Sequence, residues 1–156
     1  MRVAEFCVII MLVYISHSSS GSKLYKSLRD QCEAKGFTII TREKPFEFGE
    51  TLSEKGRQRI ELANVAIILL TAFGRSSYRV FQEAGFIAST NKDHFIIEGF
   101  GKNVEVRKKL FEHNSPLRGD ENYFSSLSSL EKMLHEFSSE LKPEAFNFIF
   151  QTDLVY

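Results

Sequence analysis

The sequence has little of what marks a disulfide-rich, metal-binding or membrane-spanning protein. Its 156 residues include two cysteines, three prolines and no tryptophan. Cys7 lies in an apolar run and Cys32 on the apolar face of a predicted helix, so we expect buried thiols in a reducing compartment. No apolar run reaches the roughly 18 residues of a membrane span. We therefore expect a cytoplasmic protein that does not associate with a membrane.

Charge and metal ligands are equally uninformative about a polyanionic or metal-dependent partner. Lysine plus arginine and aspartate plus glutamate both number 20, so no net field favours nucleic acid or an acidic membrane surface. The four histidines are scattered and the cysteines are not spaced as ligands, which predicts no metal site and no prosthetic cofactor. Phosphate-binding glycine loops and the G-x-S-x-G elbow are also missing from the sequence.

The N-terminal apolar run, Phe6 to Ile15, has two interpretations. With the small residues that follow, it has the layout of a secretory signal peptide. It also suits a strand that is buried on both faces of a parallel sheet. We favour the strand, because the next amphipathic helix needs a strand before it in order to bury its apolar face. That face contains Leu24, Leu28 and Cys32. Met11 is an alternative start, which leaves the role of the residues before it open.

Short apolar runs that alternate with amphipathic stretches predict an α/β fold. The predicted strands are Phe6–Ile15, Phe37–Thr41, Val65–Leu70 and His94–Phe100. Between them, helices are predicted from Ser22 to a stop at Gly36, from a capping box of Thr51 and Glu54, and from Ser76 or Ser77. This order builds βαβ units, which give a mostly parallel sheet with helices on both faces.

Two more helices are predicted in the C-terminal part of the chain. The first covers Asn103–Glu112, and the second begins at a capping box of Ser128 and Glu131 and ends before Pro143. The inner face of the second helix contains Leu127, Leu130, Leu134, Phe137 and Leu141. We therefore expect a single domain over residues 1–142, followed by an apolar tail over 143–156 that packs back or binds a partner.

Three predicted loops follow the carboxyl ends of strands, where parallel sheets bind their ligands. Their sequences are "SHSSSGS" (16–22), "REKPFEFGE" (42–50) and "TAFGRSSYR" (71–79). Several motifs lie in and around these loops: "YISH" from Tyr14 to His17, Gly49 with Leu52, Leu70 with Thr71, and Glu83. In this order and spacing they resemble the Toll/interleukin-1 receptor (TIR) domain superfamily, in its stand-alone prokaryotic or nucleotide-binding branch, over Val8 to Phe137. Arg79 departs from that branch, which tends to have asparagine there.

The resemblance implies a three-layer, flavodoxin-like (TIR-like) fold with a mostly parallel sheet of about five strands. It also implies an NAD nucleosidase that uses NAD as substrate, releases nicotinamide together with ADP-ribose or a cyclic isomer, and acts in immune or antiviral signalling. Self-association through TIR surfaces would complete the site. The alternatives are a non-catalytic adaptor that acts by homotypic contact and a nucleotide-sensing module.

The resemblance makes Glu83 the candidate catalytic residue, because one carboxylate beside the ribose can stabilise an oxocarbenium-like charge. The alternative for Glu83 is an ordinary solvated helix residue. The candidate binding residues are Ser16, His17, Ser18, Phe46, Phe48, Ser76, Tyr78 and Arg79.

Each candidate binding residue also has a plainer role. The serines near residue 18 contact phosphate or cap the next helix, and the two phenylalanines stack on a base or anchor their loop. Arg79 contacts pyrophosphate or forms an i,i+4 ion pair with Glu83.

Overall fold

The computed structural model describes residues 11–17, 22–40, 54–70, 75–100, 103–111 and 121–141; within these ranges the side chains of 22, 75–79, 100 and 121 are left out. The elements are β1 (Leu12–Ser16), α1 (Ser22–Ala34), β2 (Thr38–Ile40), α2 (Glu54–Leu62), β3 (Val65–Leu70), α3 (Arg75–Ser89), β4 (His94–Phe100), β5 (Asn103–Lys109) and α4 (Glu121–Ser139). Across these ranges, none of the helices combines the length and apolar character that a bilayer crossing requires.

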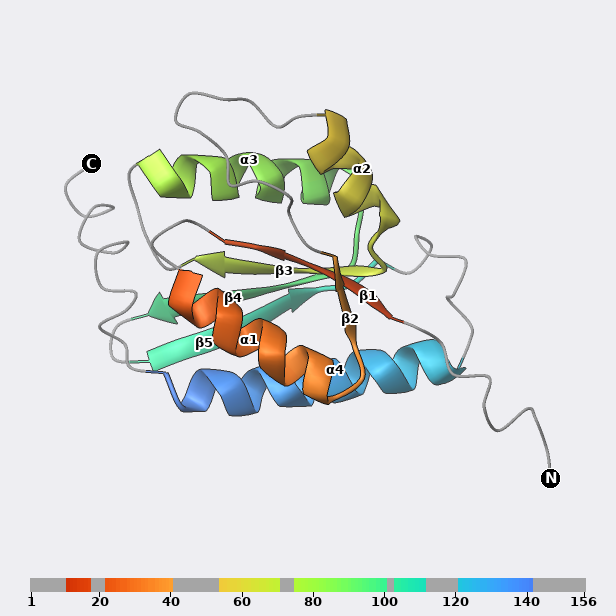
Figure 1. The fold of residues 1–156 in the computed structure, drawn as a ribbon, viewed down its shortest axis with the longest axis vertical. Helices are drawn as coiled ribbons and strands as arrows, with labels where there is room; N and C mark the ends of the chain where they lie inside the picture. The colour runs from red at the N-terminus through yellow and green to blue at the C-terminus, as the bar shows by residue number, and fades with distance from the viewer. Residues whose placement is uncertain are drawn as a thin grey trace.

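The five strands form one sheet in the order β2-β1-β3-β4-β5 (Figure 1). β1 pairs in parallel with both β2 and β3, β3 pairs in parallel with β4, and β5 runs antiparallel to β4 at the edge. The first four strands thus have the flavodoxin-like order, in which the chain passes from β1 to one side and then returns to the other. The predicted mostly parallel α/β fold is confirmed.

Helices cover both faces of the sheet, so the molecule has three layers (Figure 1). α1 and α4 pack on one face against alternate strand residues such as Val13, Ile15 and Ile67, and α2 and α3 pack on the other against Tyr14 and Ile68. Successive side chains of a strand point to opposite faces, so a strand buried on both faces is apolar throughout, as β3 is.

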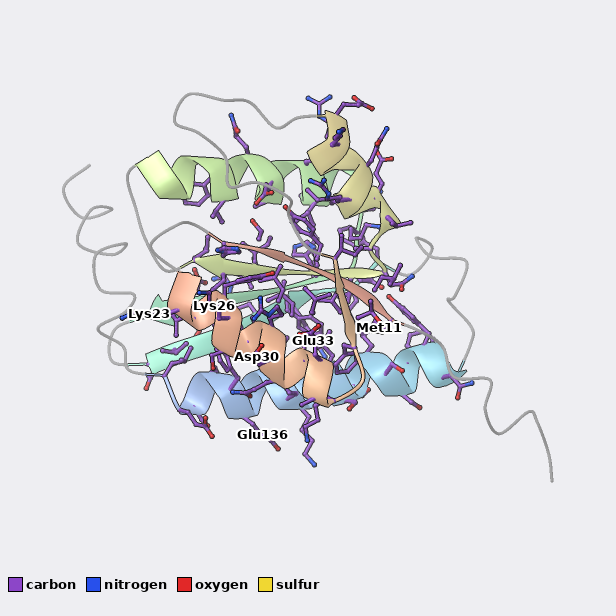
Figure 2. The ribbon with its side chains drawn as sticks, in the orientation of Figure 1. Met11, Lys23, Lys26, Asp30, Glu33 and Glu136 are labelled. Atoms are coloured by element: carbon purple, nitrogen blue, oxygen red, sulfur yellow. The ribbon has the colours of Figure 1, made fainter. Side chains whose placement is uncertain are left out.

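α1 follows the same rule with a helical period. Leu28 and Cys32 are buried against the sheet, whereas Lys23, Lys26, Asp30 and Glu33 lie on the exposed side of the helix (Figure 2). The helix ends at Gly36, whose φ of 94° lies in the left-handed region that favours glycine. The amide of Gly36 donates to the carbonyl of Glu33 and that of Phe37 to the carbonyl of Cys32, which together form a Schellman motif. The predicted stop is confirmed.

Two predicted elements are wrong in the C-terminal part. The predicted helix over Asn103–Glu112 is instead β5, where Val104 and Val106 are partly buried and alternate with exposed polar residues. That period of two is the pattern of a half-buried strand. The last helix begins at Glu121 and not at Ser128. Its first turns are fixed by the buried Tyr123 rather than by the local capping signal.

The other predicted elements agree with the structure where it describes them. β3 and β4 have the predicted bounds, and β1 occupies the second half of the predicted apolar run. Residues 1–10, the loop over 42–50, the capping residue Thr51 and the tail over 143–156 lie outside the described residues.

Candidate functional site

The candidate site lies at the carboxyl end of β1, beside β3. β1 separates β2 from β3, so the connections that follow β1 and β3 leave in opposite directions along the sheet. In open parallel sheets this point, where the strand order reverses, is the usual ligand-binding crevice. Ser16 is the last residue of β1 and is in register with Ile68 of β3.

Glu83 of α3 reaches this strand end with its carboxylate. Ser16 Oγ donates a hydrogen bond to Oε1 of Glu83 at 2.6 Å, and the hydroxyl of Tyr14 donates to Oε2. Tyr14 and Ser16 are two residues apart on one strand and therefore point to the same face, the face that α3 covers. Both carboxylate oxygens are thus held by β1.

The Glu83 side chain is completely buried, with 0% of its surface exposed. The alternative of a solvated helix residue is therefore wrong, and Glu83 lies in the middle of α3 rather than at a helix start. Burying a carboxylate is costly unless hydrogen bonds replace its water. Hydroxyl donors on both oxygens suit the ionised form, which only accepts hydrogen bonds.

His17 follows Ser16 directly but contacts the other helix layer. Its ring stacks on that of Tyr25 of α1, with centroids 4.0 Å apart and planes at 16°. The guanidinium carbon of Arg29 lies 5.7 Å from the centroid of the Tyr25 ring. The two predicted neighbours in the site, Ser16 and His17, are therefore divided between α3 and α1.

The remaining predicted site residues lie outside what the structure describes. Ser18, Phe46 and Phe48 fall in ranges that are not described, and α3 includes Ser76, Tyr78 and Arg79 without their side chains. An ion pair between Arg79 and Glu83 stays a prediction.

Sequence reasoning missed two aromatic residues at this edge of the sheet, Tyr14 and Tyr25. Tyr14 was noted only as part of the strand motif, although its spacing of two from Ser16 places both side chains on one face of the sheet. No comparable signal in the sequence pairs Tyr25 with His17.

A second buried carboxylate, Asp93, lies at the opposite edge of the sheet, immediately before β4. Its Oδ1 accepts from the amide of Phe111 and its Oδ2 from the hydroxyl of Tyr123, both at 2.6 Å. These bonds connect the start of β4 to the end of β5 and to the first turns of α4. Asp93 therefore anchors helix and strands, and it lies away from the carboxyl ends of β1 and β3.

The described residues thus define an α/β protein with flavodoxin-like strand order and a buried carboxylate where that order reverses. They contain no group of three or more histidine, cysteine, aspartate or glutamate side chains arranged to hold a metal ion. Comparisons with protein-family models, curated proteins and solved structures found no match to this chain. The TIR resemblance therefore rests on the sequence motifs themselves.

Proposed function

We propose that the protein is an NAD nucleosidase in which Glu83 is the catalytic carboxylate. The observation that carries the proposal is the burial of Glu83 at the carboxyl end of β1, with hydroxyl donors on both of its oxygens. Charge that is buried at a usual ligand-binding position and held in one orientation is what transition-state stabilisation requires. The TIR resemblance supplies the substrate.

The chemistry requires little more than a placed negative charge. Nicotinamide is bound to the ribose of NAD through a cationic ring nitrogen. When the bond from C1′ to this nitrogen breaks, the electron pair stays on nicotinamide, which leaves neutral. Positive charge then develops on the ribose, and a nearby carboxylate stabilises it. Water adds to C1′ and loses a proton, giving ADP-ribose; addition of an adenine nitrogen of the same molecule, again with loss of a proton, gives a cyclic product.

Substrate access requires a change at this edge of the sheet. Because Glu83 is completely buried, the ribose contacts it only after side chains at the edge have moved apart. The TIR resemblance implies that self-association completes the site. We therefore propose that the catalytic form is assembled from more than one copy of the chain.

The first prediction is that concentrated protein releases nicotinamide from NAD and that Glu83→Gln releases it at least about 100-fold more slowly, as when a group that stabilises transition-state charge is removed. Free nicotinamide is measured by chromatography over time. Glu131→Gln is the matched control, since Glu131 is partly exposed on α4 and pairs with Lys108. We expect that variant to keep wild-type activity.

Two outcomes would contradict the proposal. Wild-type protein that releases no nicotinamide at any concentration would exclude NAD cleavage, and equal release by Glu83→Gln would exclude Glu83. Circular dichroism of each variant establishes that the fold is intact.

A second candidate function, an adaptor that acts by contact between copies, is favoured by exposed apolar residues. Phe81 of α3 is 57% exposed and Leu62 at the end of α2 is 63% exposed, and both helices belong to the layer that contains Glu83. NAD binding without turnover would favour the nucleotide-sensing alternative. For each of these functions we propose a cytoplasmic location and a role in immune or antiviral signalling; the buried free thiol of Cys32 agrees with a reducing compartment.

A further inference from the structure

We infer that Tyr14 is a positioning residue for Glu83, holding the carboxylate in one orientation and in its hydrogen-bond-accepting form. The inference rests on the proposed function and adds a residue to it. Tyr14 acts through Glu83, since its hydroxyl donates to Oε2 of that residue.

The Tyr14 ring is itself firmly held. Tyr14 is 2% exposed and belongs to the apolar cluster that joins the sheet to α2 and α3. Its strand is paired on both sides, where Tyr14 is in register with Ile40 of β2 and Ala66 of β3. A donor fixed on a central strand defines the position of its acceptor more closely than a donor on a loop would.

Packing alone does not account for a tyrosine here. The buried cluster around the ring is made of aliphatic side chains from the strands and from α2 and α3, and the ring of phenylalanine would fill the same space. What tyrosine adds is the hydroxyl, which provides Glu83 with a second donor.

Two donors restrict the carboxylate more than one. With Ser16 alone on Oε1, the carboxylate plane can still turn about that hydrogen bond, because a glutamate side chain has three rotatable bonds. Tyr14 on Oε2 fixes the plane, so less conformational entropy is lost when the transition state forms. Both donors also favour the ionised carboxylate, which suits an N-riboside whose leaving group departs without being protonated.

Tyr14→Phe tests the inference, with Tyr123→Phe as the matched control. Both changes remove a buried hydroxyl from a buried carboxylate, Glu83 in one case and Asp93 in the other, at opposite edges of the sheet. We expect both to lower the unfolding midpoint. We expect only Tyr14→Phe to lower kcat for nicotinamide release, by about 10- to 100-fold with little change in KM, as for the loss of one hydrogen bond to a charged group.

Two further variants separate positioning from a loss of structure. Tyr14→Phe combined with Glu83→Gln should be no slower than Glu83→Gln alone, because residues that act as a unit are not additive. If Tyr14→Phe does not fold, Ser16→Ala removes the other donor and should lower kcat in the same way.

The outcomes that overturn the inference differ from those that overturn the proposed function. If wild type is active and Glu83→Gln is not, a Tyr14→Phe variant with wild-type kcat overturns the role of Tyr14 and leaves the proposed function intact. Equal losses of kcat in Tyr14→Phe and Tyr123→Phe would also overturn it, since they would reflect a general loosening of the fold. A wild type that releases no nicotinamide overturns both.

Discussion

Individual side chains in this protein take their chemistry from what packs around them. Glu83 and Asp93 are both buried carboxylates held by a tyrosine hydroxyl, yet one lies at the carboxyl edge of the sheet and the other at the amino edge. Cys32 shows the same dependence for a thiol. Burial disfavours the thiolate and raises the pKa of Cys32 to about 12, from an ordinary value of 9.0.

At this scale we predict that Cys32 resists alkylation in the folded protein. Only the thiolate reacts, and with a pKa near 12 about one thiol in ten thousand is ionised at pH 8. Native protein treated with iodoacetamide at pH 8 should keep Cys32 unmodified, whereas protein unfolded in urea should be alkylated there within minutes. Peptide mapping by mass spectrometry distinguishes Cys32 from Cys7. Rapid native alkylation of Cys32 would mean that α1 readily separates from the sheet.

At the scale of the element, two glycines illustrate opposite uses of this residue. Gly36 ends α1 with a φ of 94°, which residues other than glycine rarely adopt. Gly85 lies inside α3 with an exposed surface, and a Cβ added there would meet nothing within 4 Å. The first glycine is needed by the backbone, while the second weakens its helix.

We therefore predict opposite effects of the same substitution. Gly36→Ala should lower the free energy of unfolding by about 1 kcal/mol, because alanine is strained in the left-handed region. Gly85→Ala should raise it by about 0.5 to 1 kcal/mol, because alanine restricts the unfolded chain and favours the helix. Urea denaturation of the two variants beside wild type measures both. Effects of the same sign would be inconsistent with these backbone assignments.

The elements also show how far sequence patterns predict structure. Continuous apolar runs located β3 and β4, and four-residue spacing located the buried face of α1, because these patterns depend on residues close together in the chain. β5 was missed because an edge strand with one covered face is short and highly charged. The start of α4 was missed because Tyr123 is fixed by Asp93, 30 residues earlier in the sequence.

The whole molecule presents its two helix layers differently. Phe81 and Leu62 are exposed on the layer formed by α2 and α3, the layer that also contains the buried Glu83. A surface of this kind suits contact with a second copy of the chain. Such a contact would link self-association to the opening of the site that substrate access requires.

At this scale we predict that activity depends on protein concentration. Nicotinamide released per mole of protein should rise as the protein is concentrated, in parallel with the larger species seen by analytical ultracentrifugation. Phe81→Ser should weaken both effects. Leu110→Ser is the control, since Leu110 is 37% exposed beyond β5 at the other edge of the sheet. Activity per mole that is constant over a hundredfold range of concentration would contradict assembly.

The sequence by itself determined the alternation of strands and helices, the two-sided burial of the central strands and the end of α1 at Gly36. These features follow from contacts between near neighbours in the chain. Only the tertiary structure decided what Glu83 is. Its hydrogen-bond partners, Tyr14 and Ser16, are 69 and 67 residues away, and no local pattern relates them. They meet because the parallel crossover places α3 against the face of β1 to which alternate side chains point, where an isolated carboxylate would be too costly to bury.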